Sequence, residues 1–132
     1  MSNLDLLAKD RFAAMTGIKL TRLEPGYAVA RVELEEKHLN AANVVQGGVT
    51  FTLADFAMAA AANAHGQVAL AINCSIDFFR PPQGQYLLAE AKEVHFSNKL
   101  ATYNVEVRDE NGSLVALYKG TVYRKNEKLE TG

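Results

Sequence analysis

The stretch from Asn40 to Gly66 constrains the fold of this chain most, because it predicts one long helix that is apolar on nearly every face. The helix opens at Gln46-Gly47-Gly48, continues through an alanine run and ends near Gly66, where a left-handed conformation favours glycine. A helix that is hydrophobic all round is normally buried. Asp55 is the only Asp, Glu, Lys or Arg in the stretch. A lone buried carboxylate is unfavourable unless it has a partner or a function, so Asp55 is the first candidate functional residue.

Apolar spacing predicts a short amphipathic helix over residues 4–15, and alternating patterns between turn signals predict a series of strands. The last three strands are separated by short turns, including Asn111-Gly112, and should form an antiparallel meander. One buried helix and long antiparallel strands leave one compact solution, an α+β fold whose sheet curls around the helix. The open edges of such a sheet invite pairing with a second copy of the chain. The predicted strands cover residues 18–23, 27–35, 68–79, 86–96, 101–108 and 114–123.

The length predicts a single domain over residues 1–132, with the short helix inside 1–16 and a frayed tail over 125–132. A net charge of −1 with interspersed signs excludes the basic surface typical of proteins that bind nucleic acid or a membrane surface. Early aspartates and the lack of an apolar run predict no signal peptide, and the single cysteine, Cys74, favours a reducing cytoplasm. The three histidines lack metal-ligand spacing, so we expect no metal site.

Two interpretations of Asp55 are open from the residues alone. The first is a solvated side chain on a polar stripe that includes Thr52 and Asn63 at helical spacing. The second is a closed site, because a solvent-facing stripe is normally built from Lys, Glu and Arg, and the helix has no other such residue. In a closed site, desolvation raises the pKa of the carboxyl group and makes it a competent base or nucleophile near neutral pH.

The glycine pair Gly47-Gly48 also has two interpretations. It explains a tight turn at a helix start, and the same turn leaves N–H groups that stabilise developing negative charge. Gly47 and Asp55 are eight residues apart, which is about 12 Å along a helix. A nucleophile and an oxyanion donor must both lie ~3 Å from one carbonyl, so one helix cannot supply both. If both residues are catalytic, the site lies at a dimer interface, with one of them from each subunit.

Five segments resemble the hotdog-fold acyl-CoA thioesterases, in particular the PaaI-type branch of phenylacetate catabolism. The similarity covers residues 18–123, and residues 40–66 are its most specific part. The resemblance implies a hotdog fold, an antiparallel sheet wrapped around a long central helix. The segments are Asn40, Gln46-Gly47-Gly48, Leu53-Ala54-Asp55, Ile76-Asp77-Phe78-Phe79-Arg80-Pro81 and Val115-Ala116-Leu117-Tyr118-Lys119-Gly120.

The resemblance also implies an activity, the hydrolysis of acyl-CoA or aryl-acyl-CoA thioesters to free acid and CoA without a cofactor. Asp55 matches the family carboxylate that attacks the carbonyl or activates water. Gly47 matches the residue whose backbone N–H polarises the thioester oxygen. Asn40 matches the asparagine that positions water or substrate near the opposing subunit's carboxylate. Family members dimerise with helices at the interface and commonly pair dimers into tetramers, in agreement with the spacing argument.

The chain departs from the family pattern before the glycine pair, where Gln46 replaces the usual histidine. If that histidine only orients groups, glutamine suffices; if it titrates, activity is weakened or redirected. We expect Gln46, Gly48 and Asn73 to contact substrate, and Asn73 occupies a strand position where some relatives carry serine or threonine. Arg80 and Lys99 are candidates for the CoA phosphates, although each alone is better explained as a solvated surface charge.

We therefore predict a cytoplasmic acyl-CoA thioesterase that needs no cofactor and acts as a dimer or tetramer. The main alternative is a non-catalytic acyl-CoA-binding hotdog protein, with Gln46 as the sign of lost turnover. A hotdog dehydratase acting on hydroxyacyl thioesters is disfavoured, because that chemistry normally pairs a histidine with the acid. The acyl group stays open, since Phe51, Phe56 and Met58 fit an aryl pocket or an ordinary core. Whether Asp55 attacks directly or through water stays open too.

Overall fold

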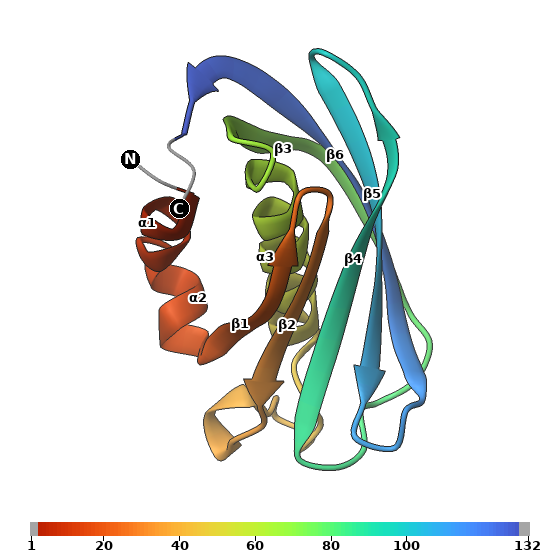
Figure 1. Cartoon of the computed structure of the whole chain (residues 1–132). Helices are drawn as coiled ribbons and strands as arrows, with labels where there is room; N and C mark the ends of the chain where they lie inside the picture. Colours follow the sequence, from red (N-terminus) through yellow and green to blue (C-terminus); the bar gives the residue numbers. More distant parts are fainter. Residues whose placement is uncertain (1–2, 130–132) are drawn as a thin grey trace.

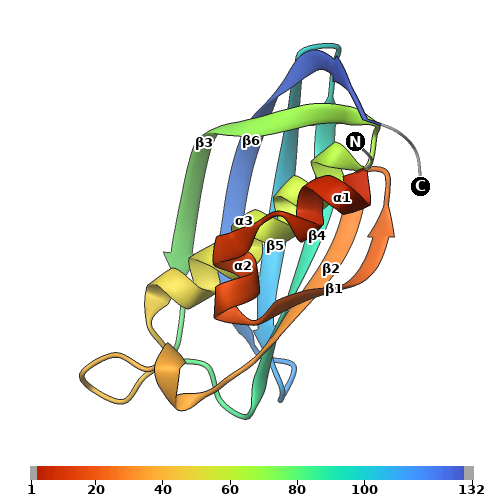
Figure 2. The same cartoon turned by 90° about the vertical axis from the view of Figure 1, so that its left-hand side faces the viewer.

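An antiparallel sheet curls around one long helix in the computed structural model of the chain, which describes residues 3–129 (Figure 1). The strand order is β1-β2-β4-β5-β6-β3, and neighbouring strands are antiparallel throughout. Two short helices cover the side of the long helix that faces away from the sheet (Figure 2). The predicted α+β architecture, a sheet wrapped around a central helix, is confirmed. The elements are α1 (Asn3–Ala8), α2 (Arg11–Thr16), β1 (Ile18–Glu24), β2 (Tyr27–Glu33), η1 (Glu36–His38), α3 (Gly47–Asn63), β3 (Gln67–Phe78), β4 (Tyr86–Phe96), β5 (Leu100–Asp109) and β6 (Leu114–Lys128).

Small side chains let the sheet approach the central helix. Ala28 and Ala30 of β2 pair with Ala91 and Ala89 of β4, and all four are fully buried where these strands pack on α3. The sheet covers one side of α3 and the short helices cover another, which explains why the helix is apolar all round (Figure 2). No helix within residues 3–129 has the combination of length and hydropathy that a membrane span requires.

The end of α3 is joined to β3 by a buried polar side chain. Gly66 has a φ of 93°, the left-handed conformation that the sequence predicted for this position. The Asn63 amide donates to the Ala59 carbonyl oxygen at 2.8 Å, and its own oxygen accepts from the Ala69 N–H at 2.9 Å. Asn63 therefore serves the helix-to-strand junction and does not belong to a solvated stripe.

The N-terminal helix differs from the prediction. Instead of one helix inside residues 1–16 there are two, α1 and α2, separated at Lys9 and Asp10. The break follows from Asp10, whose Oδ1 accepts a hydrogen bond from the Ala13 N–H at 2.9 Å and caps the start of α2. The side chain of Leu4, which belongs to the predicted apolar face, lies outside the described residues.

The C-terminal strand is longer than predicted. β6 runs to Lys128, into the tail over 125–132 that was expected to fray, because Lys128 pairs with Gln67 at the start of β3. The Leu129 N–H then donates to the Gly66 carbonyl oxygen at 2.6 Å, and Leu129 is buried. Residues 130–132 of the predicted tail lie outside the described residues.

Candidate active site

A hydrogen-bonded loop leads into the N-terminus of α3. Asn40 Oδ1 accepts hydrogen bonds from the backbone N–H groups of Ala42 (2.8 Å) and Val44 (3.2 Å), so this side chain closes the loop. The Gln46 N–H donates to the His38 carbonyl oxygen at 2.9 Å, which ties the helix start to η1. Within residues 3–129 the Asn40 side-chain NH₂ forms no hydrogen bond. Its oxygen is therefore structural, and its amide protons are left for another group.

The two glycines at the helix start have different surroundings. Gln46 caps α3, because its side-chain oxygen accepts the Gly48 N–H, and a Cβ on Gly48 would lie 2.6 Å from that oxygen. A Cβ on Gly47 would lie 3.2 Å from Cζ of Phe78. The Gly47 N–H has no partner within the described part of the chain, as the first turn of a helix leaves it unpaired. Gly47 thus supplies the open donor, while Gln46 occupies the donor of Gly48.

Asp55 lies half-buried in the middle of α3, and Tyr118 of β6 is its hydrogen-bond partner. Tyr118 Oη donates to Asp55 Oδ1 at 2.9 Å. Burial raises the pKa of Asp55, the hydrogen bond from Tyr118 opposes that shift, and the negative charge of Asp10 adds to it. Among the described residues no cation forms an ion pair with Asp55. The carboxyl group is therefore more basic than that of an ordinary aspartate, as the closed-site interpretation expects.

The sequence alone does not mark Tyr118 or Cys74 as part of the site. Tyr118 is fully buried, and its Oη lies 2.9 Å from Cys74 Sγ as well as 2.9 Å from the Asp55 carboxylate. The alternation of β6 places Tyr118 on the same face as Ala116 and Gly120, toward α3. A tyrosine on an inner face needs a partner for its hydroxyl group, and that rule could have pointed to this residue.

A groove with a volume of about 360 Å³ lies beside Gly47. Thr50 of α3 lines it together with Phe78, Phe79 and Arg80, and Arg80 is its one charged residue. Asp55 is not part of the lining. In a single chain the open N–H of Gly47 and the carboxylate of Asp55 therefore belong to separate places, as their spacing predicted.

The two predicted phosphate-binding cations lie at opposite ends of the sheet. Beside Arg80, the Phe79 N–H donates to the Val115 carbonyl oxygen at the start of β6. The Arg124 N–H, much farther along β6, donates to the Lys99 carbonyl oxygen at 2.7 Å. These two points of β6 are about 30 Å apart at ~3.3 Å per strand residue. Arg80 and Lys99 of one chain therefore do not share a phosphate group.

Asn73 lies on the face of the sheet turned away from α3. It pairs with Thr121, whose hydroxyl group is 2.9 Å from Thr102 Oγ1 on that outer face. A bulge just before Asn73 reverses the alternation of β3, so that Cys74, which pairs with Gly120, faces the helix instead. Within its own chain Asn73 therefore does not approach Asp55. Cys74 lies instead on the face of β3 toward α3.

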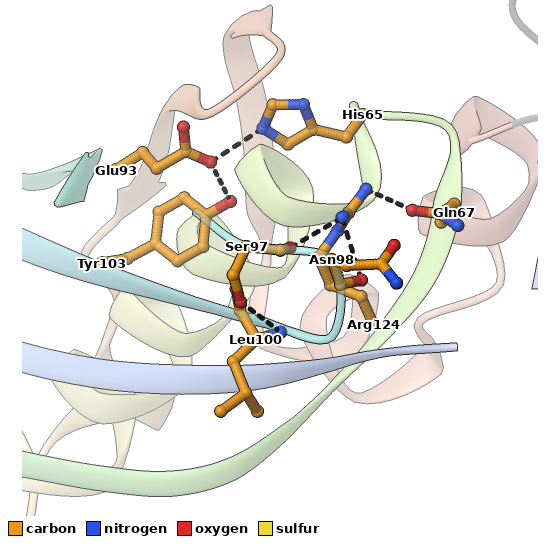
Figure 3. Close-up of polar contacts among 8 residues, drawn as sticks. All are labelled: His65, Gln67, Glu93, Ser97, Asn98, Leu100, Tyr103 and Arg124. Atoms are coloured by element: carbon orange, nitrogen blue, oxygen red, sulfur yellow. Dashed lines mark hydrogen bonds and ion pairs between the residues drawn. The ribbon is translucent and has the colours of Figure 1, made fainter. Parts of the chain in front are cut away.

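A second buried tyrosine contacts a carboxylate near the C-terminal end of α3 (Figure 3). Tyr103 Oη donates to Glu93 Oε1 at 2.9 Å, and His65 Nε2 lies 2.8 Å from the same oxygen. Arg124 donates to the Ser97 carbonyl oxygen at 2.9 Å and lies over the Phe96 ring, against which His65 also packs. No buried side-chain polar atom in the described part of the chain lacks a partner. We assign this second cluster a structural role.

Comparisons with known proteins agree with the resemblance. A family model described as "Thioesterase superfamily" matches residues 42–116. A protein of Archaeoglobus fulgidus, provisionally named an esterase, is 46% identical over 119 residues, which cover 89% of this chain and 77% of that protein. Acyl-coenzyme A thioesterase PaaI of Escherichia coli K12 is 34% identical over 116 residues, which cover 87% and 83%. The structure of the E. coli PaaI protein matches with a TM-score of 0.91 at 30% identity, over 96% of this chain and 93% of that one.

Proposed function

Because this chain belongs to the thioesterase superfamily and is a thioester hydrolase, we propose that it hydrolyses acyl-CoA thioesters to free acid and CoA. One observation carries the proposal: Asp55 is half-buried on the central helix, with a raised pKa and, among the described residues, one hydrogen-bond donor, Tyr118. A carboxylate of that kind is a competent base or nucleophile near neutral pH. The proposal locates the enzyme in the cytoplasm, where the free thiol of Cys74 stays reduced.

The active site, in this proposal, forms between two copies of the chain. β3 is an edge strand, and Leu70, Ile72 and Phe78 on it are each more than half exposed. An open edge of this kind favours pairing with a second strand. Two-fold pairing would bring the two α3 helices together, so that Gly47 of one chain faces Asp55 of the other, which one helix cannot provide. The active form is then a dimer or a pair of dimers.

The proposed chemistry uses Asp55 on one side of the thioester and Gly47 on the other. In the general-base route Asp55 takes a proton from water as the water oxygen attacks the carbonyl carbon. The carbonyl electrons move to oxygen, which accepts a hydrogen bond from the Gly47 N–H. The C–S bond then breaks, and the CoA sulfur leaves with the proton from Asp55. In the nucleophilic route an Asp55 oxygen attacks the carbonyl carbon itself, the C–S bond breaks and CoA leaves as the thiolate. Water then hydrolyses the mixed anhydride to the free acid and the Asp55 carboxylate, and the released proton goes to the thiolate.

The groove beside Gly47 supports an apolar acyl group, aryl groups included. Phe78 and Phe79 line it, whereas Phe56 and Met58 are buried in the core and lie outside it. Arg80 supplies a cation for the CoA phosphates, and antiparallel pairing at β3 would bring the Lys99 end of one sheet toward the Arg80 end of the other. We propose that Asn40 orients the thioester or water through its side-chain NH₂ and that Gln46 and Gly48 shape the site around it.

The direct test is thiol release from a panel of acyl-CoAs by the wild-type chain and by Asp55→Asn. We expect turnover of at least one aliphatic or aryl-acyl thioester and a loss of about 10³-fold or more in the variant. The panel includes crotonyl- and 3-hydroxyacyl-CoA, whose hydration or dehydration would point to a dehydratase. Binding of acyl-CoA without turnover in either form would contradict the proposal and favour a binding protein.

Gly47 offers a matched pair of variants for the oxyanion donor. Gly47→Pro removes the N–H, and proline is well tolerated at the first position of a helix. The Gln46 backbone already has the extended conformation that precedes proline, with φ −65° and ψ 133°. Gly47→Ala keeps the N–H and adds a carbon beside Phe78. We expect the proline variant to lose about 10²-fold in kcat and the alanine variant far less. Equal losses would contradict the donor role.

The shared site is tested by mixing two inactive variants. Asp55→Asn chains carry an intact Gly47, and Gly47→Pro chains carry an intact Asp55. Unfolding and refolding the mixture makes mixed dimers in which one of the two sites has both native residues, so about a quarter of wild-type activity should return. No recovery from a mixture that forms mixed dimers by native mass spectrometry would show that each site lies within one chain.

A further inference from the structure

We propose that Tyr118 is a positioning residue whose hydroxyl group holds Oδ1 of Asp55, so that Oδ2 is the oxygen presented to the thioester or to water. The inference rests on the proposed function and adds a role for a residue of β6. It starts from one contact, the hydrogen bond of 2.9 Å from Tyr118 Oη to Asp55 Oδ1.

The ring of Tyr118 is fixed in the core. It is fully buried in the middle of β6, where Tyr118 pairs with Val105 of β5 on one side and Ile76 of β3 on the other. The Phe51 ring meets it edge to face, with centroids 5.5 Å apart. A Cβ on Gly120 would lie 2.9 Å from Tyr118 Cε1, so that glycine makes room for the ring. A hydroxyl group on so constrained a ring has essentially one position.

The hydrogen bonds around this hydroxyl group have a direction. A tyrosine hydroxyl carries one proton, and Tyr118 donates it to Asp55. Cys74 Sγ lies 2.9 Å from the same oxygen, so the thiol is the donor in that contact. The result is a chain from the Cys74 S–H through the Tyr118 O–H to the carboxylate, and each step strengthens the next.

The consequence for Asp55 is that its two oxygens differ. Oδ1 is held by Tyr118, whereas Oδ2 forms no hydrogen bond within residues 3–129. Holding one oxygen fixes the rotation of the carboxylate about its last bond, which keeps the other oxygen in a reactive geometry before substrate arrives. The ionisable groups that face Asp55 are Tyr118 from β6, Cys74 behind it on β3, and Asp10 at the start of α2. Of these, Tyr118 is the one that stabilises the ionised form by donating to it.

Tyr118→Phe tests the inference, because it removes one oxygen and keeps the ring. We expect kcat to fall about tenfold on the alkaline plateau, with KM within about twofold, because an oriented oxygen acts on the bound substrate. We also expect the acidic limb of kcat/KM to move to higher pH by about one unit, because the ionised carboxylate loses a donor. A residue with a purely structural role would not move this limb.

Tyr103→Phe is the matched control. Tyr103 is also fully buried and its hydroxyl group also donates to a carboxylate at 2.9 Å, but that carboxylate is Glu93 in the structural cluster. We expect this variant to keep the wild-type kcat and pH profile, and thermal unfolding shows whether both variants fold. A Tyr118→Phe enzyme with an unchanged profile would overturn the inference while leaving hydrolysis by Asp55 intact. A wild-type chain without turnover would instead remove the proposed function.

Discussion

Two buried tyrosines in this chain donate to carboxylates at the same distance, and the two pairs differ in what else surrounds the acid. Tyr103 Oη meets Glu93 Oε1 at 2.9 Å, and His65 lies against the same oxygen at 2.8 Å (Figure 3). Tyr118 Oη meets Asp55 Oδ1 at 2.9 Å, but the third group there is the thiol of Cys74, which contacts the tyrosine and not the acid. One carboxylate has a basic neighbour, and the other has none among the described residues.

A hydrogen bond from a buried tyrosine therefore does not by itself identify a functional carboxylate. Glu93 contacts both His65 and Tyr103, and these contacts link the end of α3 to β4 and β5. Burial raises the pKa of Asp55, and within residues 3–129 one donor, Tyr118, opposes that shift. An unfavourable arrangement of this kind persists where it serves chemistry.

The largest expected effect is on turnover, and it distinguishes Asp55 from Glu93 when each is replaced by its uncharged amide. Asp55→Asn should abolish turnover and leave the free energy of unfolding unchanged or higher, because it removes a half-buried charge and keeps an acceptor for Tyr118. Glu93→Gln should keep turnover but lower the free energy of unfolding by about 1 kcal/mol, because His65 loses a charged partner. Steady-state hydrolysis and urea unfolding of both variants measure this. Loss of turnover in Glu93→Gln would contradict the assignment of Asp55 as the functional carboxylate and Glu93 as a structural one.

The helical half of the Asp55 site, α3 and Asp55 itself, could be predicted from the sequence. The run of apolar residues identified α3, Gly47 identified its start, and the absence of other charges identified Asp55. Gly66 has the predicted left-handed conformation but lies beyond the end of the helix, which is at Asn63 with Ala64 as its C-cap. The partner of Asp55 was not found, because a bulge in β3 decides which residue faces the helix. Strict alternation past Ala71 would turn Asn73 inward, but one extra residue reverses the faces and turns Cys74 toward Tyr118.

Helix capping and strand pairing at the sheet edge account for the other differences between the predicted and the observed elements. The break between α1 and α2 depends on a hydrogen bond from the Ala13 N–H to the Asp10 side chain, which competes with an apolar pattern that runs through both helices. The long C-terminal strand depends on pairing with β3, because residues 125–128 are polar and charged and carry no pattern of their own. Long-range contacts of this kind leave little trace in a local sequence.

A smaller effect concerns how stability depends on pH. The pKa of Asp55 in the folded chain lies above its ordinary value of 3.8, so the folded state binds more protons between these two values. The free energy of unfolding therefore falls as pH rises from about 4 through the raised pKa. Asp55→Asn lacks this loss, so its advantage over the wild type in the free energy of unfolding should grow between pH 4 and pH 8.

Urea unfolding at several pH values gives this difference directly. Glu36→Gln is a suitable control, since it makes the same kind of substitution at a carboxylate that is exposed in η1. That variant should differ from the wild type by a constant amount. An Asp55→Asn curve parallel to the wild type would mean that folding does not desolvate the carboxyl group.

A still smaller effect is expected at His65. His65→Gln should lower the free energy of unfolding by only about 0.5 kcal/mol, because the pair with Glu93 is partly exposed to solvent. The ring of His65 also packs on Phe96, with centroids 4.3 Å apart, and that contact is lost as well. Turnover should not change. A fall in kcat would show that the structural cluster reaches the active site and that the two pairs are not independent.

The smallest effect is expected at Cys74, the outer member of the Asp55 chain. Cys74→Ala removes the donor to Tyr118 Oη, so Tyr118 becomes a slightly weaker donor to the carboxylate. The acidic limb of kcat/KM should then move up by a few tenths of a pH unit, less than in Tyr118→Phe. Cys74→Ser retains a donor at that position and should leave the limb in place. If alanine and serine shift the limb equally, the thiol acts on Asp55 through packing, and the directed chain of hydrogen bonds ends at Tyr118.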